Sequence, residues 1–162
     1  MKLSRLLDGC DIITASGTHT VPDADIEITA LTTDSRSARR GSLFVCISGA
    51  RSDGHDFAAS AYESGCRCFL AERPLDLAKD ASVTVVSSTR RALAVIAQRF
   101  YGEPAASLRL IGITGTKGKT TTTYMIKSIL ESAGHKVGLI GTIETIIGET
   151  HIPSSNTTPE SV

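Results

Sequence analysis

The strongest constraint on the fold is an apolar run that opens into a glycine-rich loop and closes on a lysine and several threonines, Leu108–Thr123. This order predicts a parallel strand over Leu108–Ile113 and a helix that begins at Lys119. The unpaired amides of such a helix's first turn face an anion, and the helix dipole favours its charge. Lys119 can reach the β- and γ-phosphates, and the Thr120 hydroxyl can ligate Mg²⁺. The segment therefore predicts a nucleoside triphosphate site.

The spacing of the glycines restricts the class of nucleotide-binding protein that this site predicts. The general P-loop pattern asks for a glycine where this chain has Ile113. What stands here is Thr-Gly-Thr-Lys-Gly-Lys-Thr over 114–120, a shorter spacing that marks a smaller subset of ATPases. This spacing speaks against a P-loop kinase or GTPase. The alternative is a glycine-rich turn between strand and helix that binds nothing.

Composition limits the possible partners and location. The 162 residues carry 17 acidic and 17 basic side chains, which argues against a general nucleic-acid-binding or membrane-binding surface. No apolar run approaches the roughly 20 residues needed to cross a bilayer, and the N-terminus lacks a signal-peptide core. Cys46, Cys66 and Cys68 lie in apolar, strand-like runs and show no metal-ligand spacing. We therefore expect a reduced, cytoplasmic protein without membrane insertion.

Strand and helix signals alternate along the chain, which predicts an α/β fold. In the first part, the expected strands are Glu27–Thr32, Ser42–Ser48, Cys66–Ala71 and Val83–Val86. The expected helices are 2–8, His55–Ser64 with Phe57 on its apolar face, and one capped by Ser87 or Ser88 that runs to about Tyr101.

After a linker at Gly102–Pro104 the pattern continues. We expect a helix over Lys119–Ala133, a buried strand over Val137–Ile143 and a hairpin over Thr145–Ile152 that turns at Gly148. The helix should bury one stripe, made of Met125, Ile126, Ile129 and Leu130. Two α/β units result, 1–103 and 106–162. The second is small for a parallel ATPase sheet, so we expect the front part of a longer protein with an uncovered apolar face.

Several motifs together carry a family resemblance. The loop within Gly112–Thr123 resembles the ATP loop of the Mur ligases and the folylpolyglutamate synthetases. Three upstream segments resemble the N-terminal uridine-nucleotide domain shared by two of those ligases: Thr33–Arg36, Gly41–Gly49 and Asp53–Phe57. Asn156–Ser161 resembles a segment of the MurE-type ligases, the UDP-N-acetylmuramoyl-tripeptide synthetases. The resemblance covers essentially the whole chain.

The resemblance implies a three-domain cytoplasmic enzyme of peptidoglycan synthesis. Its N-terminal α/β domain would bind the uridine nucleotide, and the first part of a P-loop ATPase domain with a parallel sheet would follow. With ATP and Mg²⁺, such an enzyme adds the third amino acid, diaminopimelate or L-lysine, to UDP-N-acetylmuramoyl-L-alanyl-D-glutamate through an acyl phosphate. Catalysis of this kind is mainly positioning and charge stabilisation.

The family's functional residues map onto matching positions of this sequence. The ATP phosphates would lie against Gly115, Thr116, Lys117, Gly118, Lys119, Thr120 and Thr121. Among these, Lys119 would stabilise charge on the transferring phosphoryl group, and Thr120 would assist Mg²⁺. The UDP end of the substrate would contact Thr33, Ser35, Ala50, Arg51 and Ser52, and the muramoyl part would contact Asn156, Thr157 and Thr158.

These assignments have structural alternatives. Asp34 with its neighbours is also typical of a solvated turn in which the carboxylate caps the backbone or pairs with an arginine. Asn156–Pro159 is equally compatible with a turn held by an Asx hydrogen bond. We expect His55 to cap or cover the following helix rather than to act in catalysis.

The sequence also leaves alternatives to the ligase function. Because the modified lysine that helps to hold Mg²⁺ and the domain that selects the amino acid are absent from these 162 residues, we expect no ligation by this chain alone. One alternative is a non-catalytic module that binds the UDP-linked substrate. Another is a sibling Mur ligase that adds D-alanyl-D-alanine.

Overall fold

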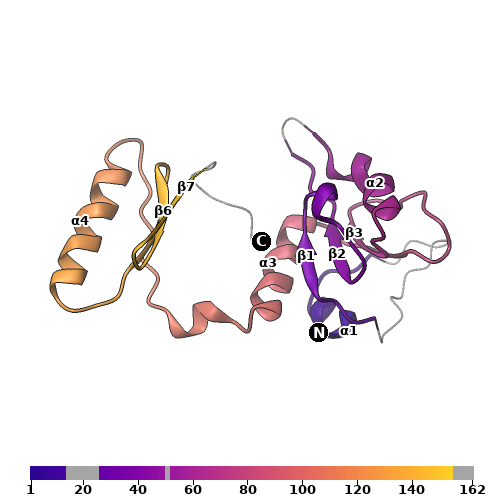
Figure 1. Cartoon of the computed structure of the whole chain (residues 1–162), viewed down its shortest axis with the longest axis horizontal. Coiled ribbons are helices and arrows are strands. Elements are labelled where there is room, and N and C mark those ends of the chain that lie inside the picture. Colours follow the sequence, from indigo (N-terminus) through magenta and orange to yellow (C-terminus); the bar gives the residue numbers. More distant parts are fainter. Residues whose placement is uncertain (14–25, 50–51, 155–162) are drawn as a thin grey trace. The chain divides into compact units, whose positions relative to one another are not determined.

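The computed structural model describes residues 1–13, 26–49 and 52–154, and the chain divides into two compact units. Unit 1 includes Met1–Ser107, and unit 2 begins at Leu108. Figure 1 follows the chain through both units, which are described separately below. Among the described residues, no helix has the length and apolar character that a transmembrane segment requires.

Unit 1 is built on a parallel sheet whose strands follow one another in chain order. The strands are β1 (Ala30–Thr32), β2 (Ser42–Val45), β3 (Cys68–Ala71) and β4 (Ser82–Val85), and they pair in the order β1-β2-β3-β4. Its helices are α1 (Leu3–Leu7), α2 (Ala58–Glu63) and α3 (Thr89–Phe100), with short 3-10 helices η1 (Ser35–Ser37), η2 (Gly54–Phe57) and η3 (Pro104–Ser107). Unit 1 thus has the α/β class that the alternating sequence pattern predicts.

Side chains on both faces of this sheet are buried, which explains why its strands read as continuous apolar runs. On one face, Leu43, Val45 and Leu70 pack with α1 and α3, in a cluster that includes Leu6 and Leu93. On the other face, Phe44 and Phe69 meet edge to face and pack with α2. In Figure 1, α2 and α3 accordingly lie on either side of the strands. Cys46, Cys66 and Cys68 are buried as expected, and burial raises the pKa of the Cys46 thiol to about 12.

Several predictions for unit 1 need correction, among them two strand boundaries and the burial of one side chain. The strand expected from Glu27 begins at Ala30, because Ile28 and the residues beside it pair with the N-terminal segment instead. The strand expected from Cys66 begins at Cys68, because the Cys66 amide donates back to Ala61 at the end of α2. Phe57, expected on a buried face, is 45% exposed.

Unit 2 consists of one helix and a small antiparallel sheet. Helix α4 (Lys119–Ser132) precedes β5 (Gly138–Ile140), β6 (Glu144–Ile147) and β7 (Thr150–Pro153), and β6 lies between the other two strands. The hairpin turns at Gly148 as predicted. The phenol of Tyr124 on α4 donates to Glu144 on β6 at 2.5 Å, and the His151 ring lies 2.6 Å from the same carboxylate.

Three expectations for unit 2 are wrong. The segment Leu108–Ile113 is not a strand, since β5, β6 and β7 pair only with one another among the described residues. The apolar stripe of α4 is not buried, because this small sheet does not cover it, and Ile129 is 67% exposed. In the expected strand Val137–Ile143, only Leu139 is buried. Exposed apolar side chains on α4, β5 and β6 confirm the uncovered apolar face that the sequence predicts.

Candidate functional site

The first candidate site is the loop that leads into α4. Gly118 is the N-cap of the helix and adopts φ +80°, a left-handed conformation that favours glycine. Because Gly118 has no side chain, nothing caps the helix from this position. The amides of Lys119, Thr120 and Thr121 have no intrahelical partner, because the carbonyls four residues before them lie outside the helix. This end of the 14-residue helix is therefore rich in hydrogen-bond donors.

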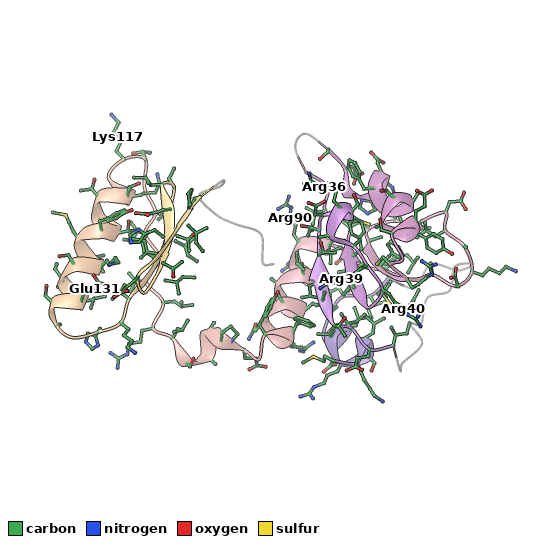
Figure 2. All side chains as sticks on the ribbon, viewed as in Figure 1. Arg36, Arg39, Arg40, Arg90, Lys117 and Glu131 are labelled. Carbon is green, nitrogen blue, oxygen red and sulfur yellow. The ribbon has the colours of Figure 1, made fainter. Side chains whose placement is uncertain are left out.

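Side chains add charge and a hydroxyl to those amides. The Lys119 ammonium donates to the Gly115 carbonyl at 2.7 Å, so the positive charge lies across the loop. The Thr120 hydroxyl is half-buried in the first turn, and the exposed side chains of Thr116 and Lys117 complete the loop. Figure 2 shows Lys117 projecting outward from the loop.

These groups fit a polyphosphate ligand. Backbone amides and an ammonium offer only donors, which suits the acceptor-only oxygens of phosphate. The described residues contain no group of three or more His, Cys, Asp or Glu side chains placed to hold a metal. A Mg²⁺ ion here would take the Thr120 hydroxyl as one ligand and would depend on phosphate oxygens for others.

The second candidate site lies where the strands of unit 1 end. In a parallel sheet every strand points the same way, and ligands of open α/β sheets bind beyond the carboxyl ends. Thr33 and Ser35, both half-buried, follow β1 at this edge. Asp34 accepts from the Arg36 amide at 2.9 Å and pairs with its guanidinium at 2.7 Å. These hydrogen bonds, the side-chain one foremost, lower the pKa of Asp34 to about 2.

Asp34 therefore serves as a cap and an ion-pair partner, as the structural alternative predicts. This role leaves Thr33 and Ser35, on either side of it, as the candidates for substrate contact after β1.

The loop after β2 is closed by a short ladder. Ser48 and Asp53 form an isolated antiparallel bridge, and the Gly49 amide donates to the Ser52 carbonyl at 2.9 Å. Gly54 packs directly on the backbone that leaves β2, where an added Cβ would lie 2.6 Å from the Ile47 nitrogen. The predicted contact Ser52 is exposed on this loop. Ala50 and Arg51 lie outside the described residues, as do Asn156, Thr157 and Thr158.

A polar network lies behind that loop, and sequence reasoning missed it. The Asp53 carboxylate accepts from the His55 amide at 3.0 Å, from Ser48 at 3.1 Å and from Arg73 at 2.8 Å, and the His55 Nδ1 atom lies 2.6 Å away. The backbone hydrogen bond from His55, followed by its ring, holds the pKa of Asp53 well below its usual range. On the far side of the ring, His55 Nε2 accepts from the Glu72 amide at 2.9 Å. His55 thus holds the end of β3 rather than covering the helix that follows it.

Arginine side chains also reach this edge. The Arg90 guanidinium, in the first turn of α3, lies 3.5 Å from the Ser48 carbonyl. Figure 2 labels Arg90 together with Arg36, the partner of Asp34. A signal for Arg90 was present in the sequence, since it lies two residues after the Ser88 cap in a segment that follows a buried strand. With the exposed hydroxyl of Ser52, this edge offers positive charge and hydrogen-bond donors suited to a nucleotide diphosphate.

Comparison with known proteins relates both parts of the chain to one family. The profile of the Mur ligase family, catalytic domain, matches residues 27–101, and that of the Mur ligase middle domain matches residues 113–162. A UDP-N-acetylmuramoyl-L-alanyl-D-glutamate--2,6-diaminopimelate ligase from Bacillus licheniformis is 46% identical over all 162 residues. The chain spans 32% of the length of that relative.

Two solved structures are also similar. A structure of a UDP-N-acetylmuramoyl-L-alanyl-D-glutamate--2,6-diaminopimelate ligase matches 99% of this chain and 31% of its own, with a TM-score of 0.74 at 21% identity, so it supports the fold. The MurF ligase from Thermotoga maritima in complex with ADP is 31% identical, with a TM-score of 0.50 over 66% of this chain and 24% of its own. Both domain profiles fall in order along the sequence, and this chain belongs to the Mur ligase family.

Proposed function

We propose that this chain carries the substrate-binding and phosphate-binding parts of an ATP-dependent ligase of peptidoglycan precursor synthesis. The reaction adds diaminopimelate to UDP-N-acetylmuramoyl-L-alanyl-D-glutamate, as in the named function of the Bacillus licheniformis relative. The observation that carries the proposal is the donor-rich start of α4, with Gly118 as N-cap and the Lys119 ammonium across the loop. The functional division at 1–103 and 106–162 is part of the same proposal.

Each unit has a distinct task in this reaction. In unit 2, the amides of Lys119 to Thr121 bind the ATP phosphates, and the Lys119 ammonium stabilises negative charge on the phosphoryl group during transfer. The Thr120 hydroxyl orients Mg²⁺ on the phosphates. In unit 1, Thr33, Ser35 and the loop of Ser52 hold the uridine diphosphate end of the substrate, with Ala50 and Arg51 assigned to the same contact. Asn156, Thr157 and Thr158 are assigned to the muramoyl part.

The chemistry explains why a phosphate loop is needed. A carboxylate oxygen is a poor leaving group, and its phosphorylation creates a good one that the incoming amine can displace. The protein's contribution is to align carboxylate and phosphoryl group and to neutralise charge, which donors fixed in a folded loop do without reorganising. The four cysteines are all free thiols, which fits the cytoplasmic location included in this proposal.

Titration calorimetry separates this proposal from its alternatives. We expect the 162-residue chain to bind UDP-N-acetylmuramoyl-L-alanyl-D-glutamate and, separately, a non-hydrolysable ATP analogue with Mg²⁺. Binding of the UDP-linked substrate alone would support a non-catalytic module instead. A clear preference for the UDP-linked tripeptide over the dipeptide would support a sibling ligase that adds D-alanyl-D-alanine. Binding of neither ligand would contradict the proposal.

A further inference from the structure

We propose that His55 is a positioning residue of the uridine-nucleotide site, acting through Asp53 on the loop that presents Ser52. This inference rests on the proposed function of unit 1. It assigns to His55 a role distinct from substrate contact, because the ring is buried at 6% exposure and both of its nitrogens already have partners within the protein.

The two partners fix the protonation pattern of the ring. A backbone amide only donates, so His55 Nε2, 2.9 Å from the Glu72 amide, must be the unprotonated acceptor. Nδ1 therefore carries the proton and donates it to the Asp53 carboxylate 2.6 Å away. The ring is neutral with its proton on Nδ1, and turning it over would lose both bonds.

The same ring links the ends of neighbouring strands. Asp53 belongs to the loop after β2, and Glu72 follows β3 directly. Glu72 in turn accepts from the amide and the hydroxyl of Thr89, the first residue of α3, at 2.8 Å and 3.0 Å. The buried imidazole thus connects the segments that follow β2 and β3, and the Glu72 side chain extends the connection to the start of α3, which follows β4. These connections all lie at the edge of the sheet to which the substrate is assigned.

Asp53 connects the His55 ring to the loop after β2, which presents Ser52. It neighbours Ser52 in the chain, and its bridge with Ser48 closes the ladder in which Gly49 donates to the Ser52 carbonyl. Without the bond from Nδ1, the carboxylate keeps its hydrogen bonds from Ser48 and from the His55 amide, so Ser48 and Asp53 would stay bridged while Ser52 beside them would be less restrained. A contact residue that must be ordered on binding costs affinity, and holding Ser52 in place beforehand avoids that cost.

Two isosteric substitutions separate the two bonds of the ring. In His55→Asn the amide nitrogen takes the place of Nδ1 and can still donate to Asp53, while the bond to Glu72 is lost. In His55→Gln the side-chain oxygen takes the place of Nε2 and can still accept from Glu72, while the bond to Asp53 is lost. The pair therefore distinguishes action on the loop from a purely structural role.

The assay is calorimetric titration of the 162-residue chain with UDP, alongside urea unfolding of each variant. We expect His55→Gln to weaken UDP binding about tenfold, the change that follows from losing a hydrogen bond to a charged group. His55→Asn should stay within about threefold of the unchanged chain. Ile96→Ala, a truncation in the fully buried face of α3, is the control, since it should lower stability without changing UDP affinity.

The outcomes have separate meanings. Equal UDP affinities for His55→Gln and the unchanged chain would overturn the positioning role alone, whereas an unchanged chain that does not bind UDP would overturn the proposed function. The ring itself gives a test that needs no variant. Nitrogen-15 NMR of the histidine side chains should show His55 protonated at Nδ1, and a proton on Nε2 would overturn the inference whatever the binding result.

Discussion

Replacing Gly54 by alanine tests how tightly the loop after β2 is packed against the strand it leaves. An added Cβ would lie 2.6 Å from the Ile47 nitrogen, 2.9 Å from the Ile47 oxygen and 3.2 Å from the Cys46 carbonyl carbon. All three atoms belong to the backbone, so no side-chain rotation can relieve the overlap. The shortest distance is about 0.8 Å below the 3.4 Å at which ordinary contact begins.

The size of the effect follows from that overlap. To accommodate the methyl group, η2 must withdraw from Ile47, which breaks the 2.9 Å hydrogen bond from the Gly54 amide to the Ile47 carbonyl. Losing that bond costs about 1 kcal/mol, and overpacking of a rigid site costs about 1–3 kcal/mol. We therefore expect Gly54→Ala to lower the free energy of unfolding by about 2–4 kcal/mol. For a unit of this size the melting temperature should fall by at least about 8 °C.

Urea and thermal unfolding followed by circular dichroism would measure the loss. Gly112→Ala is the matched control, because a Cβ at Gly112 would have no heavy atom within 4 Å and its backbone is not left-handed. That substitution should leave stability within about 0.5 kcal/mol or raise it slightly. If Gly54→Ala were as stable as Gly112→Ala, the close approach of loop and strand would be refuted.

Three further predictions concern single side chains. Ser88→Ala should lower stability by about 1 kcal/mol in urea unfolding, because it removes the cap of α3, whereas the exposed neighbour Ser87→Ala should change little. Lys119→Ala should weaken binding of a non-hydrolysable ATP analogue at least about tenfold by calorimetry, since it removes the ammonium from the loop. Lys127→Ala, on the same helix, should bind the analogue as the unchanged chain does, and equal losses for both variants would contradict the assigned role. Carboxyl NMR should show Asp34 titrating near pH 2 rather than near 3.8. Because the folded pKa is the lower one, its stabilising contribution should be complete above about pH 4 and lost as pH falls toward 2, and a midpoint near 3.8 would show that the ion pair is not formed.

The sheet of unit 1 could be predicted because its strands are buried on both faces. Residues 43–47 form an uninterrupted apolar run flanked by Gly41 and Gly49, and a run this short between glycines is typical of a buried strand. A cap at Ser87 or Ser88 was also predictable, since a serine before an amphipathic stretch marks a helix start, and the structure places the cap at Ser88. These signals are local, and the local preference agrees with the tertiary contacts.

Unit 2 shows where such signals fail. The run Leu108–Ile113 has the composition of a buried strand, but a strand also needs a neighbour to receive its hydrogen bonds. The spacing of apolar residues likewise placed Ile129 on one apolar face of α4. That spacing does not reveal whether another element packs against this face. Both predictions assumed a partner surface that composition does not specify.

The two candidate sites also differ in how far the sequence could predict them. The loop before α4 could be identified as a candidate phosphate site, because glycine, lysine and threonine stand at fixed spacing within one short segment. The role of His55 was not predictable, because its acceptor nitrogen is bound by a backbone amide 17 residues further along. Any residue at position 72 except proline supplies that amide, so no sequence pattern marks the contact.

The chain-order arrangement of β1 to β4 has a consequence for how unit 1 is assembled during synthesis. Each new strand pairs with the one made just before it, since Ala30 lies opposite Ser42, Leu43 opposite Cys68 and Cys68 opposite Ser82. No strand has to wait between distant partners or insert into a finished sheet. As the polypeptide leaves the ribosome, the sheet can therefore grow in one direction, because each new strand adds to the edge formed by the strand made just before it.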